Sequence, residues 1–478
     1  MTSQGYRAVF RVREFRFVFA AHVFSLLGGV VSHVALPVLV YTQTASPLMS
    51  AVTMGLGFMP QALGGALLAP VAERFPARPV LIGCDLICAA SVAAMAVPGM
   101  PLAALLVLRA LTAFVQPLFG GVRAAGLGDF LKGDAFVLGR SLIRISAQGA
   151  QIAGFAATGL LLLALPPRGA LLLTVAGFLV SAALLRIGTV NRPPAARPAP
   201  VTAPGSAPDR TPGTASGTER GADGRAAGAP KRGSARRTRT GGTRALFADR
   251  RIRALLLLNW LPPAFVVVPE GLAAPYSAAI GAGPVGVGLL LAAMPVGGVA
   301  AELAVGALLR PKARERLVLP LAGSLLLPFL LFAWRPGLPL ALAALLVAGT
   351  GVAYTLGLDR WFFDAVPEEL RARAMTVMTA GLMSVQGLGM AAGGVAAEFM
   401  PPHWAIVAAG GLGTVCVLAA VGAVRAAGAV PAAPDAEGSA RAADGSDCAP
   451  DDSARAADGS ASAAEAGGPV HETPMADM

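Results

Sequence analysis

Long runs of apolar residues recur along the chain, and they constrain its fold more than any other feature. Three of them are Phe17 to Val40, Leu102 to Phe119 and Leu338 to Ala353. A helix needs about 20 mostly apolar residues to cross the roughly 30 Å of hydrocarbon in a bilayer. Because lipid offers no partner to backbone N–H and C=O groups, each spanning run must satisfy those groups internally. The runs therefore predict an all-α polytopic membrane protein.

The charge content agrees with this prediction. Only 14% of the 478 residues are charged, whereas a soluble domain carries roughly 25%. We expect twelve transmembrane helices, arranged as two six-helix pseudo-repeats. Their expected positions are 17–40, 48–70, 79–98, 102–121, 143–164, 169–188, 252–275, 284–308, 316–334, 337–357, 374–397 and 403–425.

One polar segment separates the two halves of the chain, and a second polar segment follows the second half. The segment 189–250 is basic and rich in Pro, Gly, Ala, Thr and Arg, and the last segment is acidic and contains SARAADGS twice. Neither has enough apolar residues to bury a core, so both are predicted to be disordered. The expected parts are an N-terminus (1–16), a first half (17–188), a linker (189–250), a second half (251–425) and a tail (426–478).

The charges of the loops predict the orientation in the membrane. The even-numbered connections carry Arg74 and Arg78; Arg123, Lys132 and Arg140; the basic linker; Arg310, Lys312, Arg314 and Arg316; and Arg360, Arg371 and Arg373. The odd-numbered connections carry only Arg168 and Arg335. Because cytoplasmic loops gather Lys and Arg, both termini are expected in the cytoplasm. The expected location is the cytoplasmic membrane, and the Arg-, Ala- and Gly-rich composition indicates a bacterial source.

Several classes of function are excluded by the sequence. The net charge of +11 lies mostly in the linker and short loops, which indicates membrane topology rather than a nucleic-acid partner. No P-loop motif is present, so ATP is not expected to drive the protein. The four cysteines are scattered and fit neither a disulfide nor a zinc pattern. We expect no enzyme activity, no cofactor and no metal.

A comparison of the chain with itself supports an internal duplication. The stretch 151–159 (QIAGFAATG) matches 386–394 (QGLGMAAGG) at five of nine positions, with an offset of 386 − 151 = 235. The Met-Pro pairs at 59–60 and 294–295, and the residues Tyr41 and Tyr276, share this offset. Many transporters build their site at the interface between such repeats.

Certain motifs resemble the major facilitator superfamily. Its loop after the second span usually reads G-x-L-A-D-R-x-G-R-R, and residues 69–78 read APVAERFPAR, with Glu73, Arg74 and Arg78 in the charged positions. The stretches 35–47 and 367–374 resemble one branch of this family, the exporters related to the enterobactin exporter and to macrolide-efflux permeases.

This resemblance implies a secondary active transporter, specifically a proton-coupled exporter that works by antiport and alternating access. The expected substrate is a small amphipathic organic compound such as a drug, a secondary metabolite or a siderophore-like molecule. The expected partners are this substrate, protons and the lipid bilayer. Two alternatives stay open: a nutrient or metabolite importer of the same fold, and a non-transporting membrane scaffold or sensor.

Four residues are candidates for substrate binding or proton coupling because a charge inside a membrane is costly and is usually functional. Arg109 matches the family's intramembrane arginine and could meet an anionic substrate or modulate a carboxylate, or else hold helix-end carbonyls. Glu302 and Glu270 could carry protons, although Glu302 could also pair with Arg310 and Glu270 could be an interfacial charge. His33 could respond to pH, or simply form a hydrogen bond within the bundle.

Two further groups are expected to act through conformation and packing. Glu73, Arg74 and Arg78 are predicted to form a cytoplasmic latch, since an acidic side chain facing a helix N-terminus gains energy in one conformation only. Small residues allow close helix packing. The expected packing glycines are Gly154, Gly159, Gly389, Gly393 and Gly394. Within the family resemblance, the fifth-span pattern that contains Gly154 and Gly159 resembles the signature of antiporters.

Overall fold

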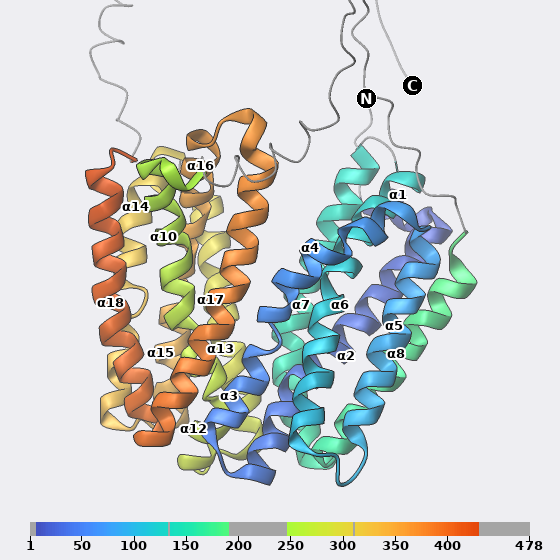
Figure 1. The fold of residues 1–478 in the computed structure, drawn as a ribbon, viewed down its shortest axis with the longest axis horizontal. Helices are drawn as coiled ribbons and strands as arrows, with labels where there is room; N and C mark the ends of the chain where they lie inside the picture. The colour runs from blue at the N-terminus through green and yellow to red at the C-terminus, as the bar shows by residue number, and fades with distance from the viewer. Residues whose placement is uncertain (1–5, 132–133, 191–245, 309–310, 430–478) are drawn as a thin grey trace, which may run out of the picture. The chain divides into compact units, whose positions relative to one another are not determined.

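The computed structural model describes residues 6–131, 134–190, 246–308 and 311–429. These residues belong to one compact unit, Met1–Val430, and all their regular elements are helices (Figure 1). Twelve segments are long and apolar enough to cross a membrane. The all-helical fold with twelve spans is therefore confirmed. Most of the predicted linker and tail lies outside the described residues, and the predicted part boundaries stay predictions.

The described residues between 6 and 188 form eight helices. They are α1 (Tyr6–Arg11), α2 (Arg13–Thr44), α3 (Pro47–Gly55), α4 (Met59–Arg74), α5 (Ala77–Ala96), α6 (Leu102–Phe130), α7 (Asp134–Ala164) and α8 (Pro167–Gly188). The second span was expected to be one helix but consists of α3 and α4, which are separated by a turn at residues 56–58. Pro60 lies in the first turn of α4, where a missing N–H costs nothing.

The second half is more interrupted. Its elements are α10 (Arg250–Val266), α11 (Val268–Gly271), α12 (Ala273–Ala279), α13 (Gly283–Leu308), α14 (Pro311–Ser324), the 3₁₀ helix η1 (Leu327–Trp334), α15 (Leu338–Gly351), η2 (Val352–Tyr354), α16 (Thr355–Ala365), η3 (Glu368–Leu370), α17 (Arg371–Phe399) and α18 (Pro402–Ala426). Pro262 and Pro263 lie inside α10, and Pro269 lies in the first turn of α11, just after the break at Val267. Each of them removes one backbone donor from the seventh span.

Equivalent helices of the two halves pack in the same way. In the first half α4 lies against α6, and in the second half α13 lies against α15. A Cβ added to Gly64 would lie 1.9 Å from the carbonyl oxygen of Phe114, and one added to Gly297 would lie 2.0 Å from that of Leu346. Only glycine permits approaches this close. The same helix pair is thus in close contact in each half, although the two glycines are 297 − 64 = 233 residues apart and not the 235 of the sequence comparison.

The outer surface of the bundle is apolar. Val107, Leu163 and Leu412 expose 67%, 66% and 62% of their surface, and many other large apolar side chains are exposed as well. A soluble monomer rarely leaves apolar patches of more than a few hundred Å² in contact with water. Lipid is the solvent that suits this surface.

The two halves touch through small residues. The helix α3 packs against α17, and α7 packs against α13. A Cβ on Gly55 would lie 2.8 Å from the carbonyl oxygen of Gly387, and a Cβ on Gly288 would lie 2.5 Å from that of Phe155. These contacts involve the parts of the helices near the odd-numbered connections. The helix α3 lies at the end of the bundle opposite α1 (Figure 1).

Candidate functional site

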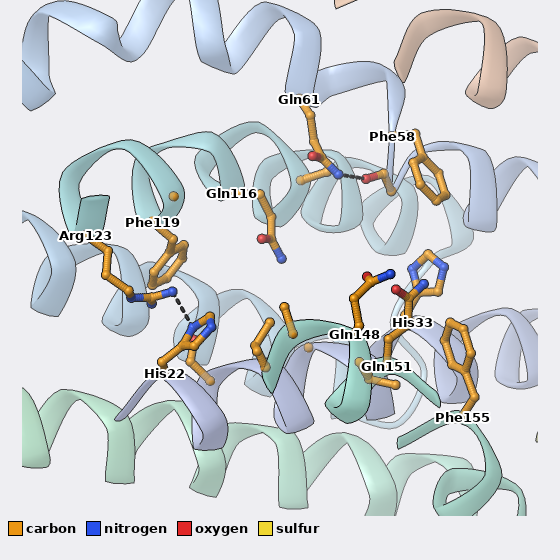
Figure 2. Close-up of a pocket in the computed structure, with 18 of the residues that line it drawn as sticks. His22, His33, Phe58, Gln61, Gln116, Phe119, Arg123, Gln148, Gln151 and Phe155 are labelled. Carbon is orange, nitrogen blue, oxygen red and sulfur yellow. Dashed lines mark hydrogen bonds between the residues drawn. The ribbon is translucent and has the colours of Figure 1, made fainter. Parts of the chain in front are cut away.

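A cavity of about 410 Å³ lies inside the first half. Its walls come from α2, α6 and α7 and from the turn between α3 and α4 together with the start of α4 (Figure 2). The walls combine two kinds of side chain, aromatic rings and glutamine amides. They are Phe58, Phe119 and Phe155, and Gln61, Gln116, Gln148 and Gln151. Apolar walls with a few placed polar groups are typical of sites for small organic molecules.

One face of α6 supplies the most polar wall. Arg109, Gln116 and Arg123 follow one another at intervals of seven residues, and all three line the cavity. Seven residues are close to two helical turns, so these side chains project from one face of the helix. Arg109 and Arg123 are therefore ~21 Å apart along the helix axis.

Arg109 is buried and forms a hydrogen bond with a histidine. It is 7% exposed, and its Nη2 lies 2.6 Å from Nδ1 of His33 on α2. A guanidinium group can only donate, so Nδ1 of His33 accepts, and the imidazole is neutral with its proton on Nε2. A Cβ on Gly57 would lie 2.2 Å from Nη2 of Arg109. The break in the second span thus leaves the space that this guanidinium occupies.

Aromatic rings surround the same histidine. The ring of Phe58 meets His33 edge-on with a centroid distance of 5.7 Å, and the ring of Phe155 stacks on it at 6.1 Å. Contacts of this kind hold a ring in a defined orientation. The Arg109–His33 pair therefore has a polar side toward the guanidinium and an apolar side toward two phenyl rings.

A second arginine–histidine pair occupies another part of the cavity wall. Arg123 donates through Nη1 to Nδ1 of His22, and its guanidinium lies 5.9 Å from the ring centroid of Phe119 (Figure 2). The sequence analysis placed Arg123 in a loop. The structure shows instead that it is 9% exposed and lies within α6, which continues to Phe130.

A buried carboxylate lies behind this second pair. Asp85 on α5 is fully buried, and its two oxygens accept hydrogen bonds from Ser25 Oγ at 3.1 Å and Ser181 Oγ at 2.7 Å. Asp85 also interacts electrostatically with Arg123. Two hydroxyl groups and a nearby cation satisfy a carboxylate that burial would otherwise penalise.

The four coupling candidates do not come together. Arg109 and His33 are in contact in the cavity wall. Glu270 lies on α11, which packs against α3 and α17 at the interface between the halves. Glu302 lies on α13 and is half-buried, and no hydrogen bond joins it to another described residue. Neither glutamate lines the described cavity.

The latch and packing candidates lie elsewhere in the bundle. The side chain of Glu73 is outside what the structure describes, and Arg74 is exposed at the end of α4. Arg78 donates through Nη2 to the carbonyl oxygen of Arg186 at the end of α8. The five predicted glycines all lie on α7 or α17 against neighbouring helices: Gly154 faces Val30, Gly159 faces Pro284, Gly389 faces Ala264, Gly393 faces Val268 and Gly394 faces Ala51.

His22, Gln148 and Arg123 line the cavity but were not predicted from the sequence to lie in a binding site. One sequence signal could have found part of this set. Arg109, Gln116 and Arg123 form a polar stripe at a spacing of seven in an apolar helix. The boundary drawn at residue 121 hid the last member of that stripe.

The family model described as Major Facilitator Superfamily matches residues 18–358, which is more than half of the chain. The chain belongs to the Major Facilitator Superfamily. Its members are transporters, so this protein is a multi-pass membrane protein and a secondary transporter of small molecules rather than an enzyme. A comparison with curated proteins finds no match.

Solved structures of other transporters share the fold. A nucleoside transporter, NupG, is similar with a TM-score of 0.65 and 15% identity, over 86% of this chain and 98% of that one. A POT family transporter in complex with 5-aminolevulinic acid has a TM-score of 0.62 and 10% identity, over 87% and 97%. A bacterial homolog of the human lysosomal transporter Spinster, inward-facing and unoccupied, has a TM-score of 0.55 and 15% identity, over 90% and 96%. Identities this low show the fold alone.

Proposed function

We propose that this transporter is a proton-coupled exporter of small amphipathic organic compounds and that it works by alternating access. The observation that carries the proposal is the buried Arg109–His33 pair in the wall of a cavity lined by aromatic and amide groups. A charged side chain inside a transmembrane bundle is expensive, and such residues usually mark a substrate or proton pathway.

His33 suits the role of proton carrier in this proposal. In the described arrangement its Nδ1 accepts from Arg109. Protonation of Nδ1 would remove that hydrogen bond and place two cations side by side, so the pair has two distinct arrangements. A proton can thereby change the environment of the substrate, which is what coupling requires. Glu270 and Glu302 stay candidates for a second proton position.

The contacts between the halves support alternating access. They are formed by glycines at one end of the bundle, and backbone-to-backbone contacts of this kind either fit closely or are lost altogether. If the positively charged connections face the cytoplasm, both termini are cytoplasmic and the closed end faces outward. The proposed direction, export by antiport, rests on the resemblance to the enterobactin-exporter and macrolide-efflux branch.

The experiment begins with a drug-sensitivity panel in a pump-deficient host, with and without an uncoupler, to find a substrate. Purified protein in proteoliposomes is then tested for flux of that substrate under an imposed pH gradient. We expect Arg109→Ala to abolish gradient-driven flux and the exposed control Arg425→Gln to retain it. Accumulation in everted vesicles supports export, whereas accumulation only in whole cells indicates an importer. Gradient-driven flux at the wild-type rate in Arg109→Ala would overturn the proposed role of the pair.

A further inference from the structure

We infer that the cavity selects an organic anion, whose carboxylate, phosphate or sulfate group binds Arg109 while its apolar part lies against the aromatic wall. This inference rests on the proposed function for one premise, that the cavity is the transport site. It goes further by fixing the charge of the substrate. The structural basis is the juxtaposition of a buried arginine that lacks a carboxylate partner with two phenyl rings in the same cavity.

The charges that line the cavity have one sign. Among the described residues, the lining includes the cations Arg109 and Arg123, two histidines (His22 and His33) that each accept a hydrogen bond from one of these arginines, and no aspartate or glutamate. A charge in a water-poor site is stable only when an opposite charge or several hydrogen bonds compensate it. A cationic compound in this cavity would meet two arginines and no carboxylate in the wall, which disfavours its binding.

Arg109 retains donors for an incoming group. A guanidinium has five N–H donors, and in the described part of the chain the only side chain that forms a hydrogen bond with Arg109 is His33. Its Nε is buried without a hydrogen-bond partner among the described residues. No ion pair joins Arg109 to a described carboxylate. The planar arrangement of the remaining donors matches the two oxygens of a carboxylate or phosphate.

Arg123 is less suited to hold the anion. Its charge is already compensated in part by Asp85, which lies behind the cavity wall. The two arginines are also ~21 Å apart along α6, so the charged group of a small molecule contacts only one of them. Arg123 therefore contributes to the positive field of the cavity, and Arg109 is the anchor.

The surroundings of Arg109 specify the rest of the ligand. Phe58 and Phe155 lie against the ring of His33 and line the same cavity. Gln148 and Gln151 lie near them (Figure 2). An amphipathic molecule with an aromatic or aliphatic body can pack against the phenyl rings, use the amides for hydrogen bonds and direct its anionic end toward Arg109.

The test compares two ligands that differ mainly in charge. Full-length protein in phosphatidylcholine nanodiscs is titrated with dansylglycine, an aromatic carboxylate, and with its neutral amide, and the dansyl fluorescence gives each dissociation constant. We expect wild-type protein to bind the carboxylate at least tenfold more tightly than the amide. Arg109→Gln should remove this preference by weakening carboxylate binding and leaving amide binding within a factor of about three. The control Arg425→Gln, on the exposed end of α18, should retain the preference.

A second variant tests the same inference in case Arg109→Gln does not fold. Gln116→Glu keeps the size of the side chain and adds an internal carboxylate to the same face of α6. It should weaken carboxylate binding and spare amide binding. Equal binding of the two ligands to wild-type protein would overturn the inference, as would displacement of dansylglycine by phosphatidylglycerol in the nanodiscs, which would assign the site to a lipid headgroup.

The titration needs no ion gradient, so its outcome is separate from that of the transport assay. Selective anion binding without gradient-driven flux would refute proton-coupled transport and leave the anion site standing. Gradient-driven flux of a neutral or cationic compound, with no preference for the carboxylate in the titration, would refute the anion site and support proton-coupled transport.

Discussion

The carboxylate of Glu398 accepts a hydrogen bond from the backbone N–H of Leu48, at a distance of 3.1 Å. It also accepts one from the hydroxyl of Ser46, the N-cap residue of α3. Glu398 lies near the end of α17 in the second half, whereas α3 belongs to the first half. The N-terminus of a helix carries a partial positive charge and unpaired N–H groups, so it favours a carboxylate. This contact therefore stabilises the arrangement in which the halves meet at this end.

We predict that Glu398→Gln weakens the closure of this end. The amide can still accept hydrogen bonds but loses the favourable charge, which is worth roughly two- to fivefold in the ratio of conformations. Ala51 is fully buried near this interface, where it lies close to Gly394. In a Cys416→Ser, Cys448→Ser background, an Ala51→Cys reporter should react faster with an impermeant thiol reagent when Glu398→Gln is present. The exposed control Glu368→Gln should leave the rate unchanged, and equal rates in all three proteins would refute the role of Glu398.

The same physical argument predicts the opposite shift for Glu73. The sequence analysis proposed that Glu73 stabilises the other end of the bundle through a facing helix N-terminus. We therefore expect Glu73→Gln to weaken the outward-open state and to slow the reaction of the Ala51→Cys reporter. A rate that matches the parent protein, with unchanged transport, would remove the latch proposed for Glu73.

Gly288→Ala should impair the contact between the halves more directly. The added Cβ would lie 2.5 Å from the carbonyl oxygen of Phe155 and 2.8 Å from the Cα of Gly159, and both are backbone atoms that cannot move cheaply. We expect at least a tenfold loss of transport rate in proteoliposomes. Gly422→Ala is the matched control, since nothing lies within 4 Å of the Cβ added there. Normal transport by Gly288→Ala would mean that the halves do not need this contact.

His33→Gln should separate substrate binding from proton coupling. The glutamine oxygen can accept from Arg109 in place of Nδ1, but the side chain cannot take up a proton. Ligand affinity should stay within about threefold of the parent value, whereas stimulation of flux by a pH gradient should disappear. Glu270→Gln and Glu302→Gln are measured alongside. Stimulation that persists in His33→Gln and disappears in one of the glutamate variants would transfer the proton-carrying role to that glutamate.

The hydroxyl groups around Asp85 should contribute unequally to stability. Ser181 Oγ lies 2.7 Å from one carboxylate oxygen and Ser25 Oγ lies 3.1 Å from the other. A hydrogen bond to a charged group contributes about 1.5–3 kcal/mol, and shorter ones tend to be stronger. Ser181→Ala should therefore lower the unfolding temperature more than Ser25→Ala. In the Cys416→Ser, Cys448→Ser background, Cys84 and Cys88, which are buried nearby on the same helix, can report unfolding through a thiol-reactive dye. The control Ser384→Ala removes only a bond to its own helix, at Ala380.

The family and its fold could be predicted from the sequence for physical reasons. Apolar runs of span length leave the backbone no alternative to helices in lipid, and the motif at residues 69–78 matched the family pattern. Arg109 and His33 were identified singly, because an ionisable residue stands out in an apolar helix. Their contact was not predicted, since the pairing of α2 with α6 depends on packing between segments 76 residues apart.

The sequence by itself determined the number of membrane spans, their approximate positions and the superfamily, because these follow from hydrophobicity and local pattern. Only the tertiary structure decided which polar groups share a cavity. It brought Arg123 out of an assumed loop and into the wall, excluded Glu270 and Glu302 from that wall, and joined Glu398 to Leu48 across the interface. Such contacts depend on how each helix rotates and tilts against its neighbours. That arrangement is set by the packing of all twelve spans together and is not encoded in the pattern of any single one.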